Sequence, residues 1–188
     1  MTARTHDLAA ITGLVVVLIN QPVRTVSVAT AILVVIANQL GGIAPDIDQP
    51  TAPFWRNLPI GGYIGRFIDK MLGGHRFITH SLLGLALTGF LLDMLLNILS
   101  PIMPSVDTGY VWWAFMIGMV SHLILDTFTK EGVPWLLPIP IKFCLPPVKS
   151  MRITTGKNAE KLLFFGLLAF NVWYISSHYT KMVDIPSL

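Results

Sequence analysis

Five long apolar stretches, separated by short polar connections, dominate this chain. They are Leu8–Ile19, Val26–Ala44, Ser81–Ile102, Tyr110–Leu125 and Leu162–Ile175. A membrane-spanning helix needs about 20 apolar residues. The second and third stretches reach that length alone, and the others reach it with their polar flanks. We therefore expect an all-α polytopic membrane bundle with about five embedded helices, or alternatively three or four spans plus a half-inserted helix.

Composition and chain length agree with a single membrane-embedded domain over residues 1–188. Only 12% of the residues are charged, against roughly a quarter in soluble domains. His6 and Asp7 precede the first apolar core and no small-residue cleavage site follows it, so we expect a retained helix rather than a secretion signal. The single cysteine, Cys144, cannot form an internal disulfide. The small positive net charge of +3 gives no reason to expect a nucleic-acid partner.

Basic residues divide unevenly between the two sides of a five-span topology. The side that holds the N-terminus, residues 45–80 and residues 127–161 carries Arg4, Arg56, Arg66, Lys70, Arg76, Lys130, Lys142, Lys149, Arg152, Lys157 and Lys161. The other side carries only Arg24 and Lys181. Because basic loops are retained in the cytoplasm, this pattern predicts a membrane protein with a cytoplasmic N-terminus and an external C-terminus.

Both long connections on the basic side have apolar surfaces. Residues 60–72 repeat apolar side chains at helical spacing, with Arg66, Asp69 and Lys70 on the other face, which is typical of an amphipathic interfacial helix. Residues 133–148 contain five prolines among large apolar residues, which predicts an extended flap because proline interrupts helices. The two segments fit a lipid-gripping role and ordinary amphipathic connectors equally well.

Seven potential metal ligands lie at the ends of the apolar stretches, all on the side of the basic loops. They are His6, Asp46, Asp48, His75, His80, His122 and Asp126. Acids and imidazoles beside membrane-embedded segments are costly unless they are paired or coordinated. The seven residues were not used to assign the topology, so their common side supports it. We therefore expect a metal site at the cytoplasmic ends of the helices.

His122 and Asp126 form the strongest pair, because residues four apart share one face of a helix. Asp46 and Asp48 follow Gly41–Gly42 and Pro45 in a turn that can present oxygens to a cation, although Asp46 can equally cap a following helix.

His75 and His80 are five residues apart and do not share a helical face. We expect His80 to be the ligand and His75 to support a ligand or contact substrate. Arg76 has a planar fork suited to phosphate, or it anchors the helix at the headgroups. Arg152 is a second candidate phosphate ligand, in a weaker cluster before the last span.

Glu160 closes that cluster and has three possible roles: metal ligand, general base, or favourable charge at a helix N-terminus. Mixed imidazole and carboxylate ligands suit Zn²⁺, Mn²⁺ or Fe²⁺ better than Ca²⁺. With His75 set aside, six candidate ligands remain. One tetrahedral zinc takes fewer than six, so a two-ion site fits better. Such a site lowers the pKa of a bound water and clamps the oxygens of a phosphoryl displacement. It favours phosphoester hydrolysis.

These motifs together resemble the YdjM-like family of inner-membrane proteins classed as metal-dependent hydrolases. The matching residues run in order along the chain: Thr5–His6, Gly42-x-x-Pro45–Asp46-x-Asp48, His75–Arg76-x-x-Thr79–His80–Ser81, His122-x-x-x-Asp126-x-x-Thr129-x-x-Gly132 and Gly156-x-x-x-Glu160. The family is similar to zinc-dependent phospholipases C and fungal single-strand nucleases, which are all-helical enzymes with a three-zinc cluster.

The resemblance implies one ion held by Asp46 or Asp48 with His80 and His122, and a second held by His6, with Asp126 bridging. The soluble relatives have a histidine where this chain has Gly156, so two ions are expected rather than three, most plausibly zinc. Glu160, His75 and Arg76 are then the expected catalytic residues, and Arg76 and Arg152 the expected phosphate ligands.

The function that we expect is hydrolysis of a lipid phosphoester at the membrane. Two alternatives compete: a metal-ion transporter, and a non-catalytic membrane regulator with a structural metal. Transport usually needs ligands near the bilayer midplane, and only Asp93, with Asn97, lies deep in a span. We expect Asp93 to face the helix bundle. The sequence does not indicate the oligomeric state.

Overall fold

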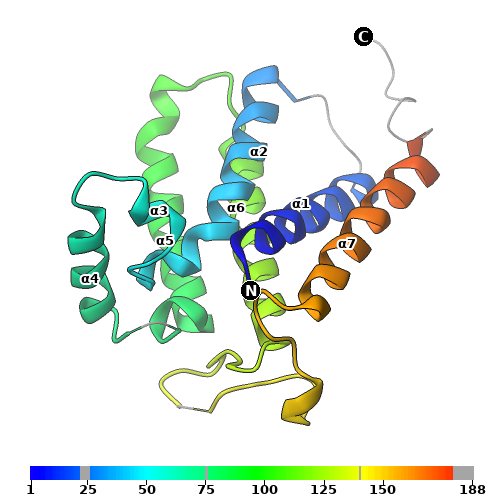
Figure 1. Ribbon diagram of the computed structural model, residues 1–188. Helices are drawn as coiled ribbons and strands as arrows, with labels where there is room; N and C mark the ends of the chain where they lie inside the picture. The colour runs from blue at the N-terminus through cyan, green and yellow to red at the C-terminus, as the bar shows by residue number, and fades with distance from the viewer. Residues whose placement is uncertain (22–25, 75, 140, 180–188) are drawn as a thin grey trace.

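The computed structural model describes residues 1–21, 26–74, 76–139 and 141–179, and it is all-helical over these residues (Figure 1). Its elements are α1 (Ala3–Asn20), α2 (Val28–Ile43), η1 (Ala44–Asp48), α3 (Pro53–Arg56), α4 (Gly61–Met71), η2 (Ile78–His80), α5 (Leu82–Leu99), η3 (Ser100–Ile102), α6 (Thr108–Thr127), η4 (Lys149–Met151) and α7 (Asn158–Ser177). The η elements are short 3₁₀ turns. Apart from two isolated bridges, the described residues form no β-structure.

Five helices are long and apolar enough to cross a membrane, as the five stretches predict. They are Ala3–Asn20, Val28–Asp48, Leu82–Ile102, Thr108–Thr127 and Asn158–Ser177. The fold class is therefore confirmed as an all-helical bundle with five candidate spans. Arg24 and Lys181, the basic residues that we assigned to the outer side, lie outside the described residues.

Polar side chains at the predicted boundaries start three of these helices. Ser27 Oγ accepts a hydrogen bond from Thr30 N at 3.1 Å at the start of α2, and Ser81 Oγ accepts one from Gly84 N at 3.0 Å at the start of α5. Asp107 accepts hydrogen bonds from two backbone amides at the start of α6. Such caps satisfy amide groups that have no partner within the helix.

Helices α2 and α6 pack in backbone contact at the centre of the bundle. A β-carbon on Gly118 would lie 2.1 Å from the carbonyl oxygen of Asn38, so only glycine fits there. The Asn38 side chain is fully buried and donates a hydrogen bond from Nδ2 to the carbonyl of Ala114 at 3.0 Å. Small residues that let backbones approach, and side-chain amides that bond across the contact, are typical of helix packing in membranes.

Helices α5 and α7 lie at the periphery of the bundle (Figure 1). Only 17% of the α5 span and 11% of the α7 span are buried, against 44% of the α6 span. The exposed side chains on both helices are mostly large and apolar, such as Phe90, Ile98, Phe165 and Trp173. Within a membrane, such surfaces face the hydrocarbon of the lipid tails.

The connection between α2 and α5 contains the short helix α4 where the amphipathic pattern lies. The apolar side chains of Tyr63, Phe67 and Met71 on α4 are exposed rather than packed on the bundle. The described residues of segment 133–148, which leave out Pro140, contain no helix, as its proline content predicts. The lipid-binding roles of both segments stay predictions.

One end of the bundle collects five chain segments (Figure 1). Helices α1, α5 and α7 begin there, and α2 and α6 end there, because an up-and-down chain with spans of similar length brings alternate helix ends together. The polar motifs in these segments are far apart in sequence. The fold places them beside one another.

Candidate metal centre

Five of the six predicted metal ligands converge at this end of the bundle. His6 comes from the first turns of α1, Asp46 from η1, His80 from η2, and His122 and Asp126 from the last turns of α6. Four of the five are buried, with exposed fractions of 1% or less, and Asp46 is half-buried. They form two groups, His6–His122–Asp126 and Asp46–His80–His122, whose ligand atoms lie within 4.8 Å of one another.

Asp126 lies between the two groups. Its Oδ1 is 3.4 Å from His6 Nε2, and its Oδ2 is 3.7 Å from His80 Nε2 and 3.8 Å from His122 Nε2. One carboxylate that presents a different oxygen to each group has the geometry of a bridging ligand. Its four-residue spacing from His122 on α6 is what the sequence predicts for a shared helical face.

His122 is held in one orientation by the end of α2. Its Nδ1 lies 2.6 Å from the carbonyl oxygen of Gly42, which can only accept a hydrogen bond, so Nδ1 carries the proton. The lone pair is then on Nε2, which faces Asp46 Oδ1 at 3.6 Å. A backbone carbonyl behind a metal-binding histidine fixes its tautomer and ring orientation in this way. The His122 ring also stacks on the His6 ring, with 3.6 Å between centroids.

His80 is held through a side-chain relay that ends on Asp48. The Thr79 hydroxyl donates to Asp48 Oδ2 and lies 2.9 Å from His80 Nδ1, from which it can accept a hydrogen bond. Asp48 is fully buried and also accepts a hydrogen bond from the backbone amide of Arg76. Asp48 therefore lies behind His80, whereas Asp46 Oδ1 faces the Nε2 atoms of His80 and His122. Of the two aspartates that the sequence leaves open, the geometry favours Asp46 as the ligand.

Among the described residues, two buried cations contact Asp126: the N-terminal ammonium of Met1, 2.7 Å from Oδ1, and the guanidinium of Arg76. Its Nη2 lies 2.6 Å from Asp126 Oδ2, and its Nη1 donates to Thr129 Oγ1 at 2.9 Å and lies 3.5 Å from Glu131 Oε2. The backbone of Arg76 is in the left-handed region, with φ of 60°. That conformation is unfavourable for a residue with a β-carbon, and bonds at both ends of Arg76 hold it.

Of the three roles that the sequence leaves open for Glu160, its position agrees with that of a charge at a helix N-terminus. It is buried in the first turn of α7, where Oε1 accepts hydrogen bonds from Thr2 and Thr5 and Oε2 accepts one from Gly156 N. These bonds join the start of α7 to the start of α1. Glu160 thus helps to position the helix that carries His6, and its catalytic role stays a prediction.

The remaining predicted residues lie at the margin or outside the described residues. Arg152 donates to the carbonyls of Pro146 and Pro147, at 2.9 and 2.6 Å, and so supports the proline-rich segment. His75 lies outside the described residues. Glu131 is 68% exposed beside Arg76 and was not singled out in the sequence, which offers no signal for it beyond its position shortly after Asp126.

The residues present fit a divalent metal. The Nε2 atoms of His6 and His122 are buried and have no hydrogen-bond partner among the described residues. A buried nitrogen left without a partner is costly, and a coordinated cation removes that cost. His122 is shared by both groups but has one free lone pair, on Nε2, so it can serve only one ion. Three protein ligands at that ion and two at the other leave open positions at tetrahedral ions, which closed structural sites do not have.

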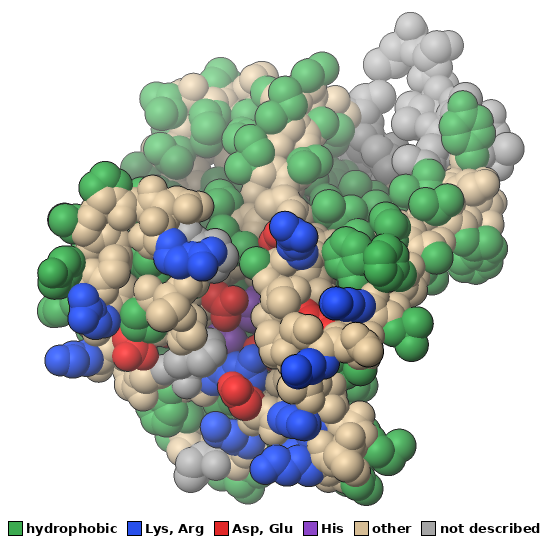
Figure 2. Space-filling view, in the orientation of Figure 1, with side chains coloured by type: hydrophobic (Ala, Val, Ile, Leu, Met, Phe, Trp, Pro, Cys, Tyr) green, Lys and Arg blue, Asp and Glu red, His purple; other side chains and the backbone are tan. Residues whose placement is uncertain are grey.

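The surface around the centre is basic. Figure 2 shows Lys and Arg side chains surrounding a recess in which His and acidic side chains are visible. Cations around a recess raise the local concentration of anionic ligands.

Comparison with known proteins shows which family the chain is similar to. The family YdjM inner membrane protein matches residues 1–183 of the chain. The chain is 32% identical to the uncharacterized protein YvsG of Bacillus subtilis over 76% of its own length and 78% of YvsG. It is 29% identical to the inner membrane protein YdjM of Escherichia coli, over 70% of its own length and 61% of YdjM.

No solved structure matches the chain. The family match covers the segments that carry His6, Asp46, His80, His122 and Asp126. With five apolar helices of spanning length, the chain is a multi-pass membrane protein. It belongs to the YdjM inner membrane protein family.

Proposed function

We propose that this protein is a membrane-bound, metal-dependent hydrolase that cleaves a phosphoester of a lipid, as a phospholipase C-like enzyme or a lipid phosphatase or phosphodiesterase. One observation carries the proposal: His6, Asp46, His80, His122 and Asp126 converge from four separate elements into two overlapping ligand groups. A buried guanidinium, that of Arg76, lies directly beside them. The resemblance to zinc-dependent phospholipases C points to the same chemistry.

Asp46, His80 and His122 would hold one divalent ion, and His6 and Asp126 would hold a second, with zinc as the best fit and manganese or iron as alternatives. When bound, the ions would supply a water of lowered pKa and stabilise negative charge on phosphate oxygens. Gly42 and the Thr79–Asp48 relay keep the Nε2 lone pairs of His122 and His80 directed at the ions.

Arg76 is the side chain best suited to hold a substrate phosphate. Its planar fork matches two phosphate oxygens, and because its Nη2 and Nη1 already contact Asp126 and Thr129, a phosphate would replace part of these contacts. Arg152 would contribute only if it left the carbonyls of Pro146 and Pro147. We propose His75 rather than Glu160 for proton transfer, because the Glu160 carboxylate already accepts hydrogen bonds from Thr2, Thr5 and Gly156.

We also propose that the centre faces the cytoplasm. Eleven of the thirteen Lys and Arg residues belong to the segments at this side of the five-span topology, and positive loops are retained in the cytoplasm. A lipid substrate would reach the centre from the inner leaflet. The exposed apolar side chains of α4 and of segment 133–148 would contact its acyl or prenyl chains.

The test is the metal content and activity of the full chain, purified and reconstituted in lipid nanodiscs. We expect two zinc ions per chain and hydrolysis of at least one member of a panel of phospholipids and polyprenyl phosphates. Chelator should abolish the activity. His122→Ala and Asp126→Asn should each lower it more than about 100-fold, because each removes a ligand, where even a supporting residue costs 10- to 100-fold.

His178→Ala is the matched control, since His178 lies at the end of α7 and bonds to the carbonyl of Tyr174. It should retain full metal content and activity. Metal-replete protein that cleaves no phosphate ester in the panel would contradict the proposal. Metal uptake into vesicles that requires Asp93 would favour the transporter instead.

A further inference from the structure

Asp93 and Asn97 form a polar pair on the outer surface of α5. Both side chains are exposed, and Asn97 Nδ2 donates a hydrogen bond to Asp93 Oδ2 at 3.0 Å. They lie four residues apart, on one face of the helix. Asp93 is near the middle of the span Leu82–Ile102. Asp93 lines the open groove between α5 and α6, on the side of Trp112 and Met116, so it turns toward the bundle as expected, but its side chain stays exposed.

This pair needs a partner that lipid tails do not provide. A carboxyl group and an amide in the middle of a bilayer are costly when they face hydrocarbon, and such residues usually face another helix or a water-filled cavity. The apolar residues elsewhere on α5, such as Leu91 and Leu95, have no such requirement. The polar pair therefore identifies which face of α5 is covered in the membrane.

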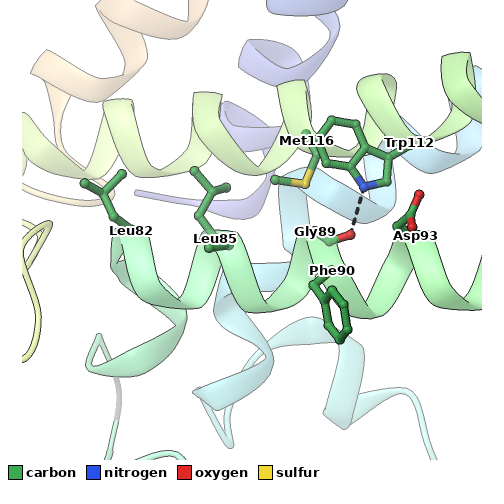
Figure 3. Close-up of a pocket in the computed structure, with 8 residues that line it drawn as sticks. Leu82, Leu85, Gly89, Phe90, Asp93, Trp112 and Met116 are labelled. Atoms are coloured by element: carbon green, nitrogen blue, oxygen red, sulfur yellow. Dashed lines mark hydrogen bonds between the residues drawn. The ribbon is translucent and has the colours of Figure 1, made fainter.

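A groove lies beside the pair, between α5 and α6 (Figure 3). Its volume is about 540 Å³, and buried Gly89 lies in its wall, where Met116 and Trp112 pack closely on the glycine and Trp112 Nε1 donates a hydrogen bond to the Gly89 carbonyl at 2.8 Å. Figure 3 shows Leu85 and Met116 directed into the space between the helices, whereas Phe90 points away from α6. Phe90 is 65% exposed.

We propose that a second copy of this chain covers this face, with α5 packed against α5 of the partner around a two-fold axis along the membrane normal. A two-fold contact joins a surface to itself, so the surface must be self-complementary. This one carries an acceptor and a donor, in Asp93 and Asn97, and a projecting ring, Phe90, beside the groove that Ala86 and Asp93 also line.

The same symmetry explains why both polar residues share one face. The axis brings the Asp93–Asn97 pair of each copy to the same depth, so the two pairs can bond to each other and leave the lipid. The projecting ring of Phe90 enters the neighbouring groove. Interhelical bonds between such side chains are a main source of helix association in membranes.

Cysteine cross-linking tests the contact with the folded protein. In a Cys144→Ser background, Ala86→Cys places a thiol two turns before Asp93 on the same face, and Leu95→Cys places one on the opposite, equally exposed face. After dilution into phosphatidylethanolamine–phosphatidylglycerol vesicles, oxidation should join Ala86→Cys copies and leave Leu95→Cys copies single. Equal yields at the two positions would overturn the proposal.

Subunit counting in the same vesicles tests the role of the pair. The unmodified chain should be dimeric, and the double variant Asp93→Leu and Asn97→Leu should dissociate about 3- to 20-fold more readily, which is the range measured for interhelical hydrogen bonds in bilayers. The conservative Asp93→Asn variant should remain dimeric. A monomeric unmodified chain, or a cation flux that requires Asp93, would refute the contact. Neither measurement depends on the proposed hydrolase activity.

Discussion

The contact between α2 and α6 differs sharply from the outer face of α5, although both belong to spans of similar length and hydropathy. In the first, the polar side chain of Asn38 is buried against the Ala114 carbonyl and Gly118 allows the backbones to touch. In the second, Asp93 and Asn97 are exposed. The difference teaches that a polar side chain within a span is covered in the first case, and that in the second case the proposed partner would have to supply the cover. The cover can come from the same chain or from a partner.

We expect the largest loss of stability when one methyl group is added at Gly118, where the backbones of α2 and α6 touch. Gly118→Ala would place a β-carbon 2.1 Å from the Asn38 carbonyl oxygen, which is backbone and cannot rotate away. We expect the free energy of unfolding to fall by about 3 kcal/mol, at the upper end of overpacking effects. Thermal or denaturant unfolding in mixed micelles measures it.

Gly166→Ala is the control for that substitution. Gly166 is also a helical glycine, on α7, and a β-carbon there would have no atom within 4 Å. This variant should be as stable as the unmodified chain or slightly more so, because alanine favours helix. If both substitutions destabilise the protein equally, α2 and α6 are not in backbone contact.

A smaller effect is expected from the relay behind His80. Thr79→Val removes the hydroxyl that links His80 Nδ1 to Asp48 and keeps the volume of the side chain. We expect zinc affinity to fall 10- to 100-fold, which is typical of losing a group that orients a ligand. Competition with a fluorescent chelator would measure the affinity.

Thr88→Val provides the comparison for the relay, since Thr88 lies within α5, away from the centre. It should bind zinc as the unmodified chain does. Equal affinity of Thr79→Val and the unmodified chain would mean that His80 is oriented by something other than this hydroxyl.

The smallest effect is expected from the buried amide of α2. Asn38→Ala removes the hydrogen bond to the Ala114 carbonyl. Interhelical hydrogen bonds in bilayers contribute about 0.6 kcal/mol on average and about 1.7 kcal/mol at most, so the unfolding free energy should fall within that range. Asn57→Ala, at an exposed position between α3 and α4, should change it less. A loss well above the range would show that Asn38 also supports packing at Gly118.

Much of the fold and part of the centre could be predicted from the sequence. Apolar length is enough to locate membrane helices. Because successive spans cross the membrane in opposite directions, counting them assigns each helix end to one side. The common side of His6, His80, His122 and Asp126 follows from that count. The four-residue spacing of His122 and Asp126 likewise requires only a helix. These predictions depend only on local geometry, which follows from the order of neighbouring residues along the chain.

The roles of individual polar residues could not be predicted in the same way. Asp46 and Asp48 are alternate residues of one turn, and only the packing of η1 against η2 shows that Asp46 faces the ligand groups and Asp48 supports His80. Glu160 carries a suitable carboxylate but bonds to Thr2 and Thr5, which come from the other end of the chain.

By itself, the order of residues determined that this chain forms apolar helices of spanning length and that its imidazoles and carboxylates lie at one end of them. Hydropathy and helical period are properties of neighbouring residues, so no partner is needed to define them. Only the tertiary structure decided how each helix is rotated about its axis. That rotation depends on packing between distant segments: it turned His122 toward Gly42, Asp126 toward Arg76, and Asp93 to the open groove beside α6.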